Sequence, residues 1–221
     1  MSLLKKVFNQ FRSANVNSDI VFQTNLKLIE KAHHQTSYRG VTMVKCPFDL
    51  VLYQMIISEV CPDLIIEIGT KKGGSALYFA DLLRNIGCGE VHTIDIEQAV
   101  DEKVLKAKNI TLFEGGWQNY LLENCQGFKR IMVIDDGSHV YDEVLAAFEK
   151  FNKLVSVGSY YIIEDGVIDQ LNIKKAWYNG GPLKASLDIL DKEPIFVLDR
   201  KYNDFFGPNA TFNPLGYLKK I

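Results

Sequence analysis

The 221-residue sequence lacks a long hydrophobic run and has almost no excess of charge of either sign. About 20 consecutive apolar residues are needed to span a bilayer, and no stretch approaches that length. The 25 Lys and Arg residues nearly balance the 27 Asp and Glu residues, so the net charge of −2 gives no reason to expect nucleic acid or a membrane as a partner. Lys5 and Lys6 interrupt the apolar residues of 1–11, which excludes the hydrophobic segment of a signal peptide. We therefore expect a cytoplasmic protein.

Cysteine is also scarce, and its spacing excludes two further classes. Cys46, Cys61, Cys88 and Cys125 are widely separated and form no C-x-x-C pair. A zinc site or a disulfide-stabilised domain would need closer or paired spacing. We expect buried free thiols.

Both common phosphate-binding motifs are missing. No G-x-x-x-x-G-K-[ST] occurs. Residues 64–76 do read as a buried strand, a glycine-bearing turn and the start of a helix, an arrangement that brings backbone N–H groups to a ligand. However, Gly69 is followed only by Gly73 and Gly74, and Lys71 stands where the dinucleotide motif G-x-G-x-x-G requires glycine.

The charges around this turn predict a different nucleoside cofactor. Glu67 places a carboxylate at the mouth of the turn, which is unfavourable for a pyrophosphate and favourable for a cationic group. Asp95 ends the next strand, 21 positions after Gly74, where a carboxylate can bind the two hydroxyls of a ribose. S-adenosylmethionine carries an ammonium, a sulfonium and a ribose but no phosphate. The alternative is that the glycines only allow helix and strand to pack closely.

A second glycine pair follows a later strand. Gly115, Gly116 and Trp117 come directly after 110–114. Glycine allows close approach and an aromatic ring can pack on a base, so Gly116 and Trp117 are candidates for an adenine pocket. A turn followed by a core tryptophan is an equally good interpretation.

Alternating strands and helices predict a parallel, doubly wound α/β sheet. The apolar spacing at 141–155 is typical of an amphipathic helix. The other expected helices are within 1–36 and at 49–60, 74–86 and 100–107. The expected strands are 64–68, 91–95, 110–114, 131–135, 159–164, and an antiparallel edge pair at 195–198 and 211–218.

Two of these strands run into pairs of carboxylates, Asp135-Asp136 and Glu164-Asp165. Neighbouring parallel strands end at the same rim of a sheet, and carboxylates crowded there repel one another unless a cation lies between them. Oxygen ligands without cysteine favour Mg²⁺. Asp136 is the better candidate for the ion, and Asp135 for the cofactor or the strand end. The alternative is that Asp-Gly simply forms a turn.

Histidine occurs at four positions. His139, three residues after Asp136, is within reach of the expected metal and could accept a proton near neutral pH. His92 lies within a strand and is expected to be structural. His33 and His34 are adjacent on an expected helix and face apart, so we expect both at the surface.

Several segments, in order along residues 38 to 221, resemble the cephalosporin hydroxylase and rhamnosyl O-methyltransferase family. They are Tyr38-Arg39-Gly40-Val41, Pro47-Phe48-Asp49-Leu50, Ile66-Glu67-Ile68-Gly69-Thr70, Gly73-Gly74-Ser75, Asp135-Asp136-Gly137-Ser138-His139, Gly158-Ser159-Tyr160, Glu164-Asp165 and the ending Thr211-Phe212-Asn213-Pro214-Leu215-Gly216-Tyr217-Leu218.

The resemblance implies a Rossmann-like class I methyltransferase fold, with a mostly parallel seven-stranded sheet and an antiparallel C-terminal edge hairpin. The Asp-Gly-Ser-His segment is similar to that of Mg²⁺-dependent macrolide sugar O-methyltransferases. Many family members have Asp where this chain has Ser138, which leaves the choice between Asp135 and Asp136 open. The resemblance assigns a metal to Asp136, Glu164 and Asp165, the general base to His139, and the cofactor loop to Gly69, Thr70, Gly73, Gly74 and Ser75.

The predicted function is therefore S-adenosylmethionine- and Mg²⁺-dependent methylation of a hydroxyl on a sugar or glycosylated small molecule. The alternatives are a catechol-like or other natural-product hydroxyl, a nicotinamide-dependent oxidoreductase, and a non-catalytic nucleoside-binding module. We expect a helical N-terminal extension at 1–60 and the methyltransferase domain at 61–221. The extension could cover the site or a neighbouring subunit, which leaves a homo-oligomer open.

Overall fold

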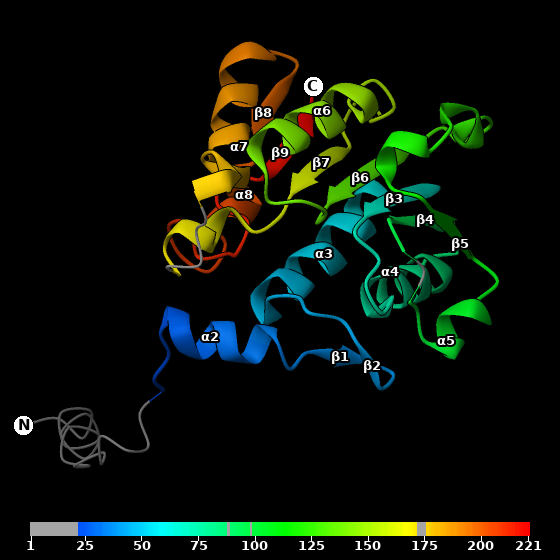
Figure 1. Ribbon diagram of the computed structural model, residues 1–221, viewed down its shortest axis with the longest axis horizontal. Coiled ribbons are helices and arrows are strands. Elements are labelled where there is room, and N and C mark those ends of the chain that lie inside the picture. The colour runs from blue at the N-terminus through cyan, green and yellow to red at the C-terminus, as the bar shows by residue number, and fades with distance from the viewer. Residues whose placement is uncertain (1–21, 88, 98, 172–175) are drawn as a thin grey trace, which may run out of the picture.

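A seven-stranded sheet lies between two layers of helices in the computed structural model, which describes residues 22–221 except 88, 98 and 172–175 (Figure 1). The helices are α2 (Leu26–His33), α3 (Pro47–Val60), α4 (Gly74–Asn85), α5 (Glu102–Leu105), α6 (Tyr141–Phe151), α7 (Gly181–Lys192) and α8 (Arg200–Asn203). The strands are β1 (Ser37–Tyr38) and β2 (Val41–Thr42), which form a separate hairpin, and β3 (Leu64–Ile68), β4 (Glu90–Asp95), β5 (Ile110–Glu114), β6 (Ile131–Asp135), β7 (Tyr160–Ile163), β8 (Phe196–Leu198) and β9 (Tyr217–Lys220).

The strand order is β5-β4-β3-β6-β7-β9-β8. β3 pairs in parallel with β4 on one side and β6 on the other, while β9 is antiparallel to both β7 and β8. The chain direction across the sheet therefore reverses between β3 and β6. Ligands of doubly wound proteins bind at this reversal, outside the carboxyl ends of the strands. The fold expected from the sequence is confirmed.

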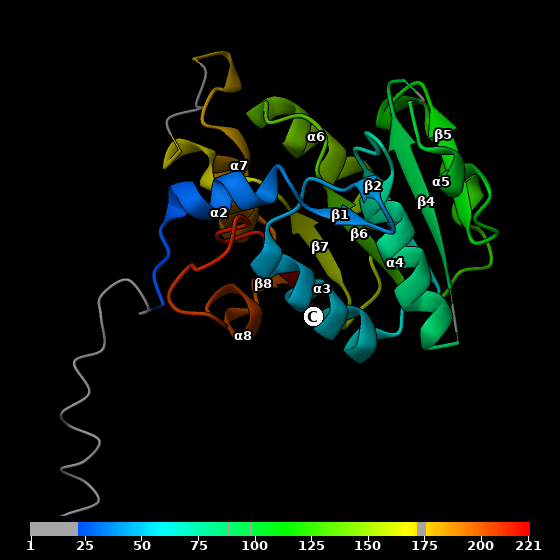
Figure 2. The same ribbon diagram turned by 90° about the horizontal axis from the view of Figure 1, so that it is seen from below.

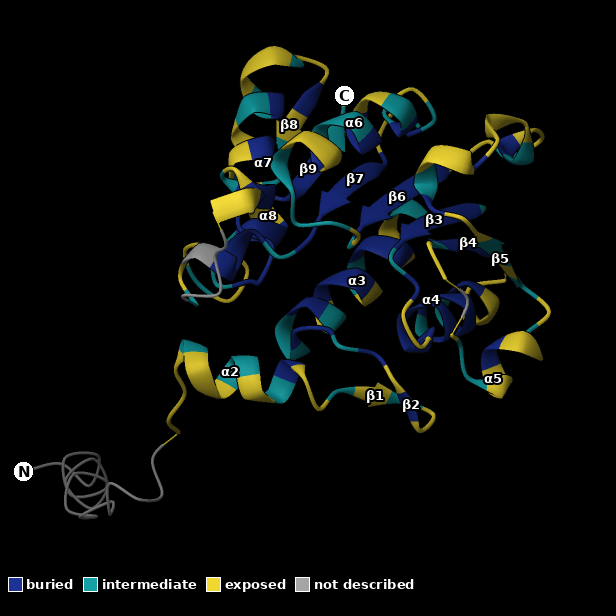
Figure 3. Ribbon diagram, viewed as in Figure 1, coloured by how far each residue is buried: buried dark blue, intermediate teal, exposed yellow. Residues whose placement is uncertain are grey.

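Successive side chains along each strand point to opposite faces of the sheet, so residues of one strand pack into the cores on both faces. Leu64, Ile66 and Ile68 of β3 contact the core beneath α6 and α7, whereas Ile65 belongs to the core beneath α3 and α4. Figures 1 and 2 show α3 and α4 on one face and α6 on the other, and Figure 3 shows that the central strands β3, β6 and β7 are buried along their length. Because α3 forms part of this core, it is a layer of the sheet domain; the expected division at residue 60 stays a prediction.

The backbones of the β3 and β6 loops touch at the reversal point. Ile68 is paired with Asp135, and the next amide, Asp136 N–H, donates to the Ile68 carbonyl at 2.9 Å. Gly69 has φ +99°, and a Cβ on it would lie 2.2 Å from the Asp136 carbonyl oxygen. Only glycine fits there. This contact holds the expected cofactor loop directly against the acidic loop.

The sequence predictions of single elements hold for most of the sheet and fail near the C-terminus. The strands expected at 64–68, 110–114 and 131–135 have those bounds. α7 was not predicted, and the strand expected over 211–218 begins only at Tyr217. Its first half cannot join the sheet, since Pro214 has no N–H and the Phe212 N–H donates to a side chain of α3 instead.

Other expectations concern residues away from the sheet. Of the helical region expected within 1–36, residues 1–21 lie outside the described part of the chain and α2 falls in the rest. Cys46 and Cys125 are buried free thiols and Cys61 is a half-buried one, while Cys88 is not described. Within the described ranges, no helix is both long enough and apolar enough to cross a membrane.

Asp49, in the first turn of α3, ties the N-terminal half of the chain to the C-terminal segment. Its carboxylate is buried and accepts hydrogen bonds from the Thr211 hydroxyl (2.6 Å), the Phe212 N–H (3.0 Å) and the Tyr217 hydroxyl (3.2 Å). Burial raises the pKa of Asp49 from 3.8 to about 6, although these three donors act in the opposite direction. The native protein therefore keeps this proton to higher pH than the unfolded chain.

This pKa predicts a pH-dependent contribution to stability. A raised carboxyl pKa stabilises the fold fully below the unfolded value, and the contribution is lost as the pH rises through about 6. The shift of about two units corresponds to about 3 kcal/mol. We expect the free energy of unfolding of wild type minus that of Asp49→Asn to fall by about 2 kcal/mol between pH 4, where the unfolded carboxyl is already partly ionised, and pH 7, measured by urea denaturation. The exposed Asp191→Asn is the control for loss of a carboxyl group. A difference that stays constant with pH would contradict the assignment.

Candidate functional site

A cavity of about 590 Å³ lies at the carboxyl ends of the central strands, within the size range of small-molecule sites. Its walls come from the loops after β3 to β7 and from the segment that joins α2 to α3. The expected site residues that line it are Gly69, Thr70, Ser75, Asp95, Gly116, Trp117, Asp136, His139 and Asp165; those that do not are Glu67, Gly73, Gly74, Asp135 and Glu164.

Asp95 and Trp117 form the end of the cavity that lies over β4 and β5. Both Asp95 carboxylate oxygens accept backbone N–H groups, from Lys71 at 2.8 Å and from Ile96 at 2.7 Å. These bonds fix the carboxylate while each oxygen keeps a second lone pair for a ligand. Trp117 lines the cavity and also packs on the core beneath α6. The adenine-pocket interpretation and the core-tryptophan interpretation therefore each describe part of its environment.

Glu67 lies under the glycine turn rather than in its mouth. It is fully buried, and its Oε2 accepts from the Thr93 hydroxyl at 2.6 Å. The Thr93 hydroxyl is also 2.7 Å from that of Thr70, which reaches the cavity wall. Oε1 has no hydrogen-bond partner within the described residues. A buried carboxylate oxygen left without a donor is costly, and burial raises the pKa of Glu67 while Lys45 and the Ser75 and Thr93 hydroxyls lower it.

Gly73, Gly74 and Asp135 have structural contacts. Gly73 starts α4 with φ +79°, and a Cβ on Gly74 would lie 2.4 Å from the Thr42 carbonyl oxygen. Asp135 accepts from the Tyr161 hydroxyl (3.1 Å) and from Gly137 N–H (3.3 Å), and burial raises its pKa to about 7. For these three residues direct contact with a cofactor stays a prediction, and close packing accounts for their positions.

The acidic end of the site contains a cation that sequence reasoning missed. Lys45 is 1% exposed, and its ammonium lies 2.6 Å from Asp136 Oδ2 and 2.6 Å from Glu164 Oε1. Tyr53 also donates to Glu164 Oε1, at 2.7 Å. Burial alone would lower the pKa of Lys45, but Asp136, Glu164 and Glu67 outweigh it and raise the pKa. Lys45 is therefore charged.

The backbone around Lys45 holds its side chain in this position. The Thr36 hydroxyl accepts from Lys45 N–H at 3.0 Å and donates to the Lys45 carbonyl at 3.1 Å. Val44, which lines the cavity, has φ +53°. A β-branched residue in the left-handed region is strained, and such strain concentrates at functional sites.

One lysine does not balance the acidic cluster. Burial raises the pKa of Glu164 well above its usual value, Lys45 lowers it and Asp136 raises it further. Asp165 is raised to about 7 by burial and then by Asp136. The oxygen-only donors fit a hard divalent cation, whose charge would offset the repulsion that raises these pKa values. Among the described residues no group of three His, Cys, Asp or Glu side chains is placed to hold a metal ion, and Lys45 contacts both Asp136 and Glu164.

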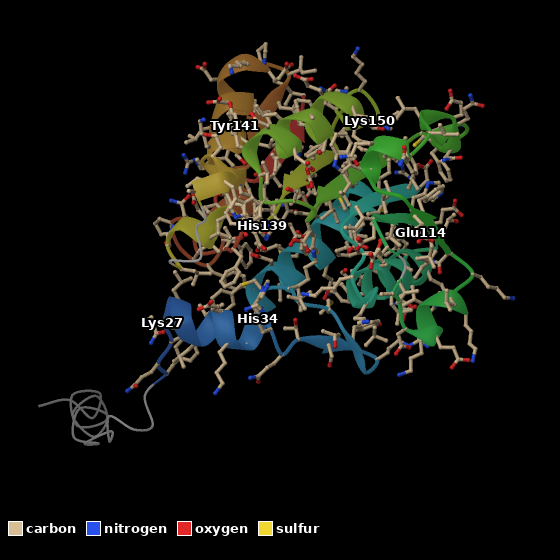
Figure 4. The ribbon with its side chains drawn as sticks, in the orientation of Figure 1. Lys27, His34, Glu114, His139, Tyr141 and Lys150 are labelled. Carbon is tan, nitrogen blue, oxygen red and sulfur yellow. The ribbon has the colours of Figure 1, made fainter. Side chains whose placement is uncertain are left out.

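His139 lies beside this cluster, on the loop between β6 and α6 (Figure 4). Its Nε2 is 3.6 Å from Asp165 Oδ2, and its ring meets that of Tyr178 edge-on at 5.6 Å. The Ser138 hydroxyl accepts from Val140 N–H at 3.1 Å and shapes the turn that leads into α6. The imidazole borders the cavity, as a general base must.

The sequence also predicted positions for the other three histidines. His92 is buried between the Tyr120 hydroxyl (2.6 Å) and Glu90 (3.0 Å), in agreement with a structural role. The surface position expected for His33 is wrong: it is 8% exposed and lines the cavity, while His34 is exposed. Because adjacent residues on a helix face apart, the His34 ring points outward and the His33 ring points inward.

Comparisons with known proteins show which family the chain resembles. The family described as Rhamnosyl O-methyltransferase/CmcI matches residues 30–221. A rhamnosyl O-methyltransferase of Mycobacterium bovis is 34% identical over 193 residues, 83% of this chain and 78% of the relative. One from Mycobacterium leprae is 30% identical over 157 residues, 68% of each chain.

Solved structures of CmcI are similar to this chain in fold. A CmcI structure with Mg and S-adenosylmethionine has a TM-score of 0.64 at 25% identity and covers 85% of this chain and 77% of its own. An apo CmcI structure has a TM-score of 0.66 at 23% identity, covers 97% and 95%, and is a likeness of fold.

The buried position of Lys45 predicts a large effect on stability. Lys45→Met leaves Asp136 and Glu164 without their cation, and breaking a buried ion pair in this way typically costs about 3–5 kcal/mol. We expect the free energy of unfolding in metal-free buffer to fall by about this amount. Lys153→Met, at an exposed position, is the matched control and should change it by less than about 0.5 kcal/mol. Equal stability of the two variants would mean that the ion pairs contribute little.

Proposed function

Since this chain belongs to the rhamnosyl O-methyltransferase/CmcI family and is an S-adenosylmethionine-dependent O-methyltransferase, we propose that its acceptor is a sugar hydroxyl and that the reaction requires a divalent metal. The observation that carries the proposal is the convergence of His139 with Asp136 and Asp165 on one cavity that also contains Asp95. Cytoplasmic location and a homo-oligomer stay predictions.

The polar side chains around Asp136 support a sugar over a catechol. Near Asp136 the wall carries the Ser138 hydroxyl, the His139 imidazole and the carboxylates of Glu143 and Asp165. A planar aromatic acceptor would be expected to lie among predominantly apolar side chains. A ring with several hydroxyls can instead use each of these donors and acceptors.

At the cofactor end, Asp95 and Thr70 line the cavity and would contact the ribose and the methionine end of the cofactor. Glu67, buried beneath the turn, would act through the Thr93 and Thr70 hydroxyls. S-adenosylmethionine supplies an electrophilic methyl group on its sulfonium. The residues of the protein have to hold the acceptor oxygen in line with that group and remove its proton.

His139 is the residue that we assign to the proton. It accepts the proton of the acceptor hydroxyl, and the Asp165 carboxylate, 3.6 Å away, stabilises the resulting positive charge on the imidazole. Asp136, Glu164 and Asp165 would hold the metal, which supplies a Lewis acid that lowers the pKa of the hydroxyl. Lys45 keeps two of these carboxylates in place.

The acceptor class can be tested directly. Purified enzyme with S-adenosylmethionine and Mg²⁺ is assayed for formation of S-adenosylhomocysteine with methyl α-L-rhamnopyranoside, other methyl glycosides and catechol. We expect turnover with glycosides and little with catechol. Preference for catechol would overturn the sugar proposal and leave the methyltransferase assignment intact.

Removal of the base should reduce the chemical step alone. His139→Ala is expected to lower kcat by about 10²–10⁴-fold, the usual contribution of general base catalysis. The dissociation constant of S-adenosylmethionine, measured by isothermal titration, should not change. His34→Ala, at an exposed position, is the control. Wild-type kcat in His139→Ala would remove this residue from the mechanism.

The metal requirement makes a separate prediction. EDTA should abolish turnover and added Mg²⁺ should restore it, because the acidic cluster needs a divalent cation to orient the acceptor. Asp136→Asn should respond weakly to Mg²⁺ at any concentration while still binding S-adenosylhomocysteine. Full turnover of the wild type in EDTA would sink the metal hypothesis.

A further inference from the structure

His33 is a polar side chain in the cavity wall that the mechanism above does not use. It comes from α2, which Figure 4 shows carrying the labelled His34 and which lies outside the sheet domain expected from the sequence. The His33 ring stacks on Phe212 with 5.0 Å between centroids and an interplanar angle of 28°. Leu26 and Ile29 of α2 pack on the cluster that contains Phe212. The position of the ring is therefore fixed by packing.

The hydrogen bonding of His33 is incomplete. Its Nδ1 is buried and has no hydrogen-bond partner within the described residues. An unpartnered buried nitrogen costs about 1–3 kcal/mol, and this one belongs to a ring that borders the cavity. Unsatisfied polar atoms of this kind in a native structure indicate a function or a ligand.

The surroundings of His33 select the chemistry of that ligand. Burial lowers the pKa of His33 to about 4, with Asp136 acting in the opposite direction and His34, Lys45 and Lys71 in the same one. The imidazole is therefore neutral near pH 7, with one nitrogen donor and one nitrogen acceptor. A hydroxyl group also both donates and accepts. A carboxylate could only accept a hydrogen bond and a cation could only donate one, so either would match one ring nitrogen and not the other.

The location of His33 distinguishes between the acceptor and the cofactor. Apart from the adjacent His34, Asp136 acts on His33 most strongly and Lys45 next, and both belong to the acidic end of the site. Lys71 of the loop that holds Asp95 acts more weakly. The residues expected to bind ribose and adenine, Asp95 and Trp117, come from the loops after β4 and β5. We propose that His33 binds a hydroxyl of the acceptor sugar next to the one that is methylated, so that α2 forms a wall of the acceptor site.

This inference rests on the proposed sugar acceptor, and the test separates the two. The chain has four histidines, so ring ¹⁵N signals of a histidine-labelled sample can be assigned by substitution. S-adenosylhomocysteine and Mg²⁺ are added first, then methyl α-L-rhamnopyranoside. We expect the His33 signals to stay in place at the first step and to move together with those of His139 at the second. His34 and His92 are internal controls.

Three results would overturn the proposal. Movement of His139 alone on addition of the rhamnoside would mean that the sugar binds without His33. Movement of His33 on addition of S-adenosylhomocysteine would make it a cofactor contact. Movement of neither histidine at saturating rhamnoside, with cofactor bound, would count against the sugar acceptor itself.

Kinetics of matched variants provide the second readout. His33→Phe keeps an aromatic ring to stack on Phe212 but has no ring nitrogen, and His33→Asn places an amide near the position of Nδ1. We expect KM for the rhamnoside to rise about tenfold in His33→Phe, the size of one lost hydrogen bond, with kcat and cofactor affinity retained. His33→Asn should recover part of this loss, and His34→Ala should resemble wild type. Wild-type KM in His33→Phe would show that the ring only packs.

Discussion

The ammonium of Lys45 between Asp136 and Glu164 is the interaction on which the site depends. Parallel strands that end in acidic residues bring like charges to one edge of a sheet, where they repel. A lysine from the segment before α3 lies among them at 2.6 Å from two of the carboxylates. With Lys45 in place, burial and neighbouring carboxylates still raise the pKa values of Glu67, Glu164 and Asp165. The ammonium and sulfonium of the cofactor and a divalent metal would offset this repulsion.

The same lysine changes the interpretation of the N-terminal part of the chain. Residues before the sheet were expected to be an extension, yet the segment 33–45 supplies the cation of the acidic cluster and one wall of the cavity. Val44 accepts a strained backbone conformation within this segment, and Thr36 closes it with two hydrogen bonds to Lys45. The segment 33–45 is therefore a structural part of the site.

The sequence predicted the parts of the site that lie at the ends of strands. Apolar runs that end in Asp95, Asp136 or Glu164 identify strands and their rim, because strands of one parallel sheet end at one edge. Lys45 could not be found in this way, since its partners lie 91 and 119 residues away. The role of each glycine also depends on contacts that are distant in the sequence. The sequence does not distinguish a glycine that faces a ligand from Gly74, where a neighbouring backbone carbonyl leaves no room for a side chain.

The position of β9 has a consequence for how the protein is made. β9 lies between β7 and β8 although it follows both in the chain. On a ribosome, β8 emerges with the place beside it empty, and the sheet is completed only after residue 220 has left the exit tunnel. Asp49, which is synthesised much earlier, also waits for Thr211, Phe212 and Tyr217 before its carboxyl group has its donors. Until β9 has emerged, β7 and β8 keep unpaired edges, and such edges make folding intermediates prone to aggregation.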